Sequence, residues 1–538
     1  NNLLFFIIFN IFILKNVLAI TGIDAKKLII DRQQRLTSLY SVMKGKKIID
    51  ENYNEREFII SFCPITGQFE EGKSAHKKNP EWIYNISDLF MGAGSYSYIT
   101  QFIARLSESH PLTEDEKLLI SKNIEALFHL KEYRFDVYEI DKNIDEEDVS
   151  QVFVRINSAG TPLNQNNFIL TLLSVHWDEG RKDIEAFCEA SSAPAKTAAS
   201  SYNSIGITVS PQDIIRTVMA YAFDRARLKY GYKLLRGADL EGRGSISREL
   251  RDKNFDTLKK KLPDVINVNN WHEFLKTVIN AGYLTSSMIS SDNAVFYTYS
   301  MYLIAKDRFN ADYKSNMALT SLWFFYASLT SLYTGSFEST AESHLNVIQN
   351  CSSLEDYRRF IIDRVTERLT DDYFSITLPG SGNLTLSGSS KNAWCAYVAS
   401  LNILGRKVLF SQSNILVSKL FEAGSDGKHK SLEKHHLFPK AYLKKEKGYT
   451  DKQINQTANC AYIDWHDNIK ILDKAPEIYY PVICDGMTPE EITRMEDENA
   501  LPHGWEKMNY DEFLTQRRKL MAAIIKQAFE LLREKAKA

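Results

Sequence analysis

Two adjacent histidines stand within the stretch EKHHLFPK, residues 433–440. Adjacent side chains of an extended strand point to opposite sides, so His435 and His436 can perform different tasks. One imidazole can hold a metal ion while the other faces a substrate water. Glu433 lies two residues before His435 and therefore on its side of the strand, where a carboxylate can orient a ligating imidazole.

Two asparagines follow this stretch. Asn459 precedes the apolar run Ala461–Ile463, which predicts another strand. Asn468 comes nine positions after Asn459 (468 − 459) and begins a polar stretch through Lys470, for which we expect a helix. The segment thus presents imidazole and amide groups in a defined order, with Pro439 three residues after the second histidine.

This order resembles the ββα-metal fold of HNH nucleases, and their pattern is a ligand, a base histidine, a proline, a middle asparagine and a ligand on the closing helix. The resemblance implies that His435 and Asn468 hold one divalent cation, Mg²⁺ or Mn²⁺. It also implies that His436 is the general base, while Asn459 holds the loop and orients the base. The remaining charged positions would support the ligands or contact DNA: Glu433, Lys440 and Lys470.

The chemistry of phosphodiester hydrolysis suits these side chains. One cation can neutralise the charge that develops on the phosphate, and a neutral imidazole can take a proton from water. Between Asp426 and Lys474, ten lysines stand against seven acidic residues, a net charge of +3 (10 − 7), which favours phosphate contact. The alternative is that the histidines and asparagines fill loops and the lysines form a solvated surface.

Composition sets outer limits on the class of protein. A chain of 538 residues is too long for one hydrophobic core and predicts two or three domains. The net charge is −2, so a surface for nucleic acid must be local. The six cysteines form no CxxC pair, which argues against a thiolate zinc site and fits a reducing cytoplasm. We therefore expect a cytoplasmic protein.

The first twenty residues, Asn1–Ile20, are almost wholly apolar and are interrupted by Lys15. The two apolar stretches are each short for a membrane span, which needs roughly 20 residues. A signal peptide needs a positive start and a small-residue cleavage site, and neither is clear. Three interpretations stay open: a membrane anchor, a buried strand or helix, or a spurious start of a truncated gene.

A polar loop, Asp31-Arg32-Gln33-Gln34-Arg35, lies between a predicted strand at Leu28–Ile30 and a predicted helix that Gly45 ends. Free N–H groups at a helix N-terminus attract phosphates, and an arginine can bind phosphate through two hydrogen bonds. The alternative is a helix cap with surface glutamines, and chemistry alone favours that alternative.

The loop resembles the DGQQR signature of the ParB/sulfiredoxin-like α+β domain in GmrSD-type restriction proteins. A second family segment is similar to Val152–Leu163, which reads VFVRINSAGTPL. The resemblance implies that the domain binds a nucleoside triphosphate through Asp31, Gln33, Gln34 and Arg35. Arg32 replaces the glycine of the signature, and glycine permits positive φ; we therefore expect weak or absent nucleotide hydrolysis.

Four segments follow from these patterns. Residues 1–20 form the apolar segment, for which we favour a truncated or mis-started product, and residues 21–190 form the nucleotide-binding-like domain. Residues 207–378 form a helical middle region, with core helices expected at Asn293–Ala305 and Leu319–Tyr333. We expect residues 391–538 to form the HNH domain. In the first domain, the sequence predicts a short strand at Glu57–Phe62.

The chain closes with a predicted amphipathic helix. We expect its apolar face to carry Phe513, Leu520, Ile524, Ala528 and Leu531. The basic side chains are expected mostly off that face: Arg517, Arg518 and Lys526.

The sequence therefore predicts a multidomain α+β protein that resembles a type IV, modification-dependent restriction endonuclease. The resemblance implies metal-dependent cleavage of foreign DNA, gated by nucleotide, with no membrane partner; an oligomer is compatible with it. The main alternative is a degenerate, non-cleaving nucleotide- or DNA-binding protein of defence or regulation. A membrane-anchored protein is the third class.

Overall fold

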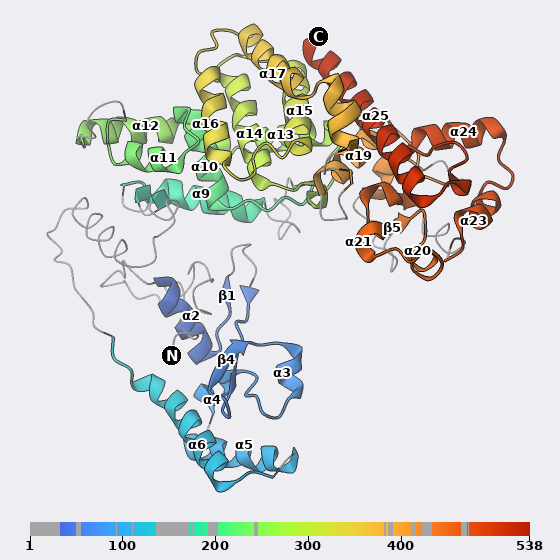
Figure 1. Ribbon diagram of the computed structural model, residues 1–538. Helices are drawn as coiled ribbons and strands as arrows, with labels where there is room; N and C mark the ends of the chain where they lie inside the picture. The colour runs from blue at the N-terminus through green and yellow to red at the C-terminus, as the bar shows by residue number, and fades with distance from the viewer. Residues whose placement is uncertain are drawn as a thin grey trace. The chain divides into compact units, whose positions relative to one another are not determined.

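The computed structural model describes residues 33–49, 55–92, 94–109, 111–135, 169–170, 172–173, 176–191, 203–240, 246–380, 384–385, 391–411, 415–421, 433–463, 471 and 473–538. The chain forms two compact units, residues 1–164 and 165–538. The helical region and the histidine-bearing segment, which the sequence predicts as separate domains, share the second unit (Figure 1).

The first unit combines short antiparallel hairpins with helices. Helix α2 ends at Lys44 before Gly45, whose φ of +58° is the left-handed value that glycine adopts without strain. The sequence predicts a strand at Glu57–Phe62. The paired strand of the structure is β3, which begins later than expected, and its Phe62 stands opposite Phe69 of β4. The elements are α2 (Gln33–Lys44), β1 (Ile48–Ile49), β2 (Glu55–Arg56), β3 (Ile60–Cys63), β4 (Gln68–Glu71), α3 (Ser74–Lys78), α4 (Ile86–Met91), α5 (Ser95–Ser109), α6 (Glu114–Phe128) and η2 (His129–Glu132).

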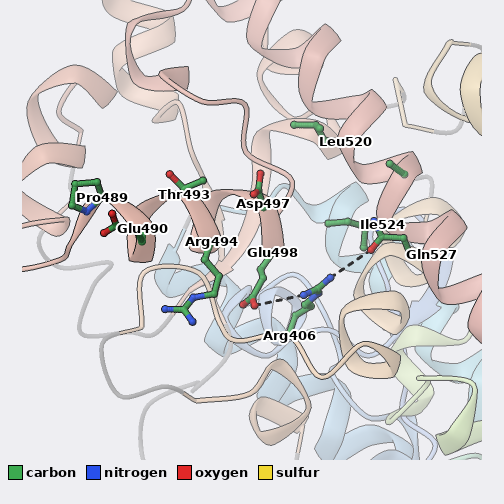
Figure 2. A pocket seen from close by; sticks show the side chains of 11 residues that line it. Arg406, Pro489, Glu490, Thr493, Arg494, Asp497, Glu498, Leu520, Ile524 and Gln527 are labelled. Carbon is green, nitrogen blue, oxygen red and sulfur yellow. Dashed lines mark hydrogen bonds and ion pairs between the residues drawn. The ribbon is translucent and has the colours of Figure 1, made fainter.

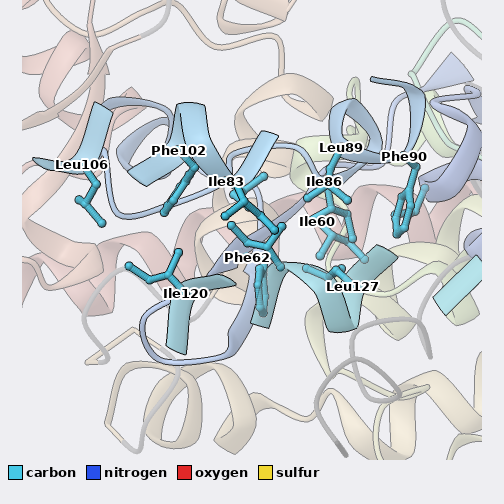
Figure 3. Packing of buried hydrophobic residues seen from close by; sticks show 13 residues of the cluster. Ile60, Phe62, Ile83, Ile86, Leu89, Phe90, Phe102, Leu106, Ile120 and Leu127 are labelled. Carbon is cyan, nitrogen blue, oxygen red and sulfur yellow. The ribbon is translucent and has the colours of Figure 1, made fainter. Parts of the chain in front are cut away.

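The core of this unit lies where β3 meets α4, α5 and α6 (Figure 3). All four side chains of β3 are buried, and burying one such apolar side chain stabilises the fold by about 1.5–3 kcal/mol. Helices and strands thus share one core, which supports the predicted α+β class. Its best buried members are Ile60, Leu89, Leu106, Ile120 and Ile124.

Helices build the first part of the second unit, as the sequence predicts. Helices α14 and α15 are buried on almost every side because they are apolar all round, and α15 packs against α13, α14, α17, α19 and α25. The elements are α9 (Asp178–Ala190), α10 (Pro211–Phe223), α11 (Leu228–Leu235), α12 (Arg248–Val265), α13 (Val268–Asn280), η3 (Ser286–Met288), α14 (Asp292–Asp307), α15 (Tyr313–Leu329), α16 (Phe337–Ile348), α17 (Leu354–Arg368), η4 (Tyr373–Thr377), α18 (Leu378–Gly380) and α19 (Lys391–Ile403).

The rest of the second unit surrounds one small hairpin. Strand β5 pairs with β6 in the antiparallel sense, and helix α25 packs both on this region and on the helices before it. The long helix thereby joins the hairpin segment to the helical core. The elements are η5 (Val417–Phe421), β5 (Glu433–His436), α20 (Lys440–Lys447), α21 (Asp451–Ile454), η6 (Thr457–Asn459), β6 (Cys460–Ile463), α23 (Pro476–Ile483), α24 (Pro489–Glu498), η7 (Trp505–Lys507) and α25 (Tyr510–Lys537).

Helix α25 is amphipathic, but its buried face differs from the predicted one. Phe513, Ile524 and Ala528 are buried as expected, whereas Leu520 and Leu531 are exposed. The prediction for Arg517 is also wrong, because this side chain is fully buried. Position 517 lies one helical turn after Phe513, on the same face. Main-chain oxygens of the hairpin segment accept hydrogen bonds from its charged side chain.

Candidate active site around the β5–β6 hairpin

The two histidines lie on a paired strand, as the sequence predicts. His435 stands opposite Ala461 and His436 stands opposite Cys460 in the antiparallel register of β5 and β6. Residues directly opposite in such a pair share a face of the sheet. The two imidazoles therefore leave opposite faces of the hairpin, and both are partly buried.

Asn459 ties the chain on both sides of the hairpin. Its side chain is fully buried. Its Oδ1 accepts a hydrogen bond from Phe438 N at 2.9 Å, while its Nδ2 donates to Phe438 O at 3.1 Å and to Ile454 O at 3.0 Å. These three hydrogen bonds tie the loop after His436 to the end of α21. The role in orienting the base that the resemblance implies stays a prediction.

The loop after His436 is fixed by further contacts. Leu437 N donates to Asn459 O at 2.8 Å, and the Tyr479 hydroxyl donates to Leu437 O at 2.6 Å. The ring of Phe438 packs against Phe513 with 4.8 Å between ring centroids, and against Trp505 and Tyr510. The backbone next to the histidines is thus held by hydrogen bonds and by an aromatic cluster.

A buried cation supports the second strand. Arg517 Nη1 donates to Ala458 O at 2.6 Å and to Cys460 O at 2.9 Å, on either side of Asn459. Burial lowers the pKa of the Arg517 guanidinium. The sequence analysis missed this role; the available signal was the four-residue spacing from Phe513 on the buried stripe of α25.

A second missed residue contacts the predicted base directly. His436 Nε2 lies 2.9 Å from Asn455 Oδ1. Asn455 follows α21, nineteen positions along the chain from His436, and its position is not one of those in the motif quoted above. The contact arises from the tertiary fold alone.

The predicted DNA-contacting lysine on this segment shares one carboxylate with a second lysine. Lys440 is exposed, and its Nζ lies 3.0 Å from Asp451 Oδ1, while Lys444 Nζ lies 2.9 Å from the same oxygen. Hydrogen bonds from Lys444 and Lys440 hold the pKa of Asp451 below its ordinary value. The two ammonium groups together carry one more charge than their shared carboxylate neutralises.

Several predicted residues fall outside the described part of the chain. These are Asn468, Lys470 and the side chain of Glu433. Among the side chains that the structure does describe, no three His, Cys, Asp or Glu residues gather into a metal-binding group. Of the two predicted ligands, His435 is the one with a described position.

One hollow lies elsewhere in the second unit. It measures about 720 Å³ between α24, α25 and Arg406, which contacts Glu498 and Gln527 there (Figure 2). None of the described residues of the hairpin lines it.

Comparison with known families finds a match in the N-terminal part of the chain. Residues 6–174 match the family described as GmrSD restriction endonuclease, N-terminal domain. The match supports the GmrSD-type resemblance of this region and points to a defence protein of the restriction-endonuclease kind. The β5–β6 hairpin lies outside the matched range. No curated protein matches the chain.

The GmrSD-type region contains the predicted nucleotide loop. Asp31 and the side chains of Gln33, Gln34 and Arg35 lie outside the described residues, as do Leu28–Ile30 and Val152–Leu163. Helix α2 begins at Gln33. The matched range also starts within the apolar segment Asn1–Ile20. Over the residues described, no helix has both the length and the apolar character needed to cross a membrane.

Proposed function

We propose that the chain is a metal-dependent DNA endonuclease of the restriction type, with the β5–β6 hairpin as its nuclease site. The observation that carries the proposal is the juxtaposition of His435 and His436 on one strand whose following loop is clamped by buried Asn459. The GmrSD-type region elsewhere in the chain supports the same class of activity.

In this proposal His436 takes the proton from the attacking water. His435 and Asn468 would hold one divalent cation, which would neutralise the charge that develops on the phosphate. One imidazole and one amide oxygen would leave most positions of a Mg²⁺ or Mn²⁺ ion to water and phosphate oxygens, as such ions prefer at phosphodiesters. This donor set fits the ion, and Lys440 and Lys444 add positive charge for the DNA backbone.

The proposed substrate, and the ligand proposed to gate its cleavage, follow from the resemblance of the N-terminal region. We propose foreign DNA with modified bases as the substrate, and a nucleoside triphosphate, bound through Asp31, Gln33, Gln34 and Arg35, as the gating ligand. The rival is a degenerate, non-cleaving nucleotide- or DNA-binding protein. Arg32 at the glycine position of the loop bears on nucleotide hydrolysis alone.

A plasmid assay separates the two. Purified chain is incubated with modified and unmodified plasmid, with and without Mg²⁺ or Mn²⁺ and each nucleoside triphosphate. The proposal predicts nicked or linear products that require the divalent ion and depend on DNA modification. Retention of plasmid in a gel-shift assay without any cleavage, in all conditions, would establish the rival.

A further inference from the structure

The contact between His436 and Asn455 has a defined polarity. The 2.9 Å separation joins His436 Nε2 to the amide oxygen of Asn455. An amide oxygen only accepts hydrogen bonds, so the imidazole donates through Nε2. In a neutral imidazole the other ring nitrogen then carries the lone pair. The contact therefore selects the tautomer whose basic atom is Nδ1.

The fold fixes the position of Asn455. Its N–H donates to Asp451 O at 3.0 Å and so ends α21. The residue before it, Ile454, is fully buried. The carbonyl oxygen of Ile454 accepts from Asn459 Nδ2 at 3.0 Å and from the Tyr510 hydroxyl at 3.2 Å. The backbone that carries the Asn455 amide is thus anchored to both the hairpin and α25.

One buried side chain sets the distance between the two partners. Asn459 Nδ2 donates to Phe438 O, two residues after His436, and to Ile454 O, one residue before Asn455. The same amide group therefore ties together the two backbone segments that carry the contact. A base that is held in one orientation and one tautomer is in its reactive form in a larger fraction of molecules.

We propose that Asn455 is a positioning residue that holds His436 in the Nε2–H tautomer, with Nδ1 as the basic atom. The proposal rests on the nuclease function proposed above and adds to it the residue that orients the base. Asn455 acts through His436 and need not touch DNA or metal.

Two variants of Asn455 and one matched control test this role kinetically. Asn455→Leu keeps the size of the side chain and removes the acceptor, so kcat should fall by about 10- to 100-fold, with KM within about twofold. Asn455→Asp keeps an oxygen acceptor and should restore kcat to within about fivefold of the wild type. Gln516→Leu removes a side-chain amide of α25 that donates to Glu512 Oε1 at 3.1 Å, and should keep the wild-type rate.

A spectroscopic readout is independent of cleavage. In protein labelled with ¹⁵N-histidine at pH about 8, where an ordinary imidazole is neutral, the signals of His436 are identified by their loss in His436→Ala. The wild type should show a protonated Nε2 and a bare Nδ1, and Asn455→Leu should show a mixture of tautomers.

The two readouts separate the claims. A wild-type spectrum with the proton on Nδ1, or an Asn455→Leu protein with unchanged tautomer and unchanged kcat, overturns the positioning role. A wild-type protein that shows the Nε2–H tautomer but cleaves no DNA contradicts the nuclease function instead, while the effect of Asn455→Leu on the spectrum still decides whether Asn455 sets the tautomer.

Discussion

Arg517 Nη1 lies 2.6 Å from the carbonyl oxygen of Ala458, so that a fully buried cation of α25 holds the turn that carries Asn459. A second bond from the same nitrogen reaches Cys460 O at 2.9 Å. The last helix of the chain is thus a structural support of the candidate site, and each of the contacts around that site leads to a measurable consequence.

Removal of this cation should destabilise the second unit. Arg517→Met leaves two buried carbonyl oxygens without their donor, and relief of the buried charge offsets part of that loss. We expect the free energy of unfolding to fall by about 2 kcal/mol in urea titration. Lys519→Met, at an exposed position of the same helix, is the control. Equal stability of the two variants would show that the Arg517 contacts are unimportant.

The amide of Asn459 should matter more for stability than any exposed asparagine. Asn459→Ala removes three hydrogen bonds from a fully buried site, and we expect a loss of about 3 kcal/mol in the same titration. Asn269→Ala, at an exposed position of α13, should change stability by less than about 0.5 kcal/mol. If both variants unfold at the same urea concentration, the hydrogen bonds of the Asn459 side chain contribute nothing to stability.

Acid should weaken the helical core through His344. Burial, together with nearby Arg364, lowers the pKa of His344 to about 4 from the ordinary 6.5, and its ring packs on Trp323. Between these two pH values the unfolded chain binds more protons than the folded chain, so stability is full above pH 6.5 and falls as the pH falls towards 4. The loss should approach about 3 kcal/mol, from the 2.5-unit difference (6.5 − 4).

The measurement is the free energy of unfolding between pH about 4 and 7 in the wild type and in His344→Phe. The phenylalanine has no titrating group and fits an aromatic environment, so the decline with acid should be shallower in this variant. Parallel curves for the two proteins would assign the acid sensitivity to other groups.

Cleavage should depend on metal through His435 and Asn468. Excess EDTA should stop the wild type, and His435→Ala or Asn468→Ala should raise the Mn²⁺ concentration needed for half-maximal cleavage by about 10-fold or more. His503→Ala, a histidine that contacts Glu496 away from the hairpin, should leave this concentration unchanged. Undiminished cleavage in excess EDTA rules out the metal mechanism.

The sequence predicted the parts of the fold that depend on local pattern. The apolar character of 293–305 and 319–333 placed α14 and α15 in the core, and the run Ala461–Ile463 placed β6. Asn459 was singled out from a motif, and its buried side chain is hydrogen-bonded to the backbone of Phe438; its role at the site stays a prediction.

The parts that the sequence missed depend on tertiary contacts. Asn455 meets His436 only because α21 folds back to the hairpin. The helical pattern alone predicts Arg517 as a surface residue. In the fold, its side chain donates to the carbonyl oxygens of Ala458 and Cys460. A buried charge is predictable only when its partners are known, and no local pattern supplies them.

Plasmid cleavage by the wild type and by His436→Ala, with Mg²⁺ or Mn²⁺ and modified DNA, tests the central claim most directly. The account predicts metal-dependent cleavage by the wild type and a loss of at least about 100-fold in His436→Ala. DNA binding and the thermal unfolding midpoint should stay near their wild-type values, because the base acts on the chemical step. A well-folded His436→Ala protein that cleaves at the wild-type rate would contradict the account.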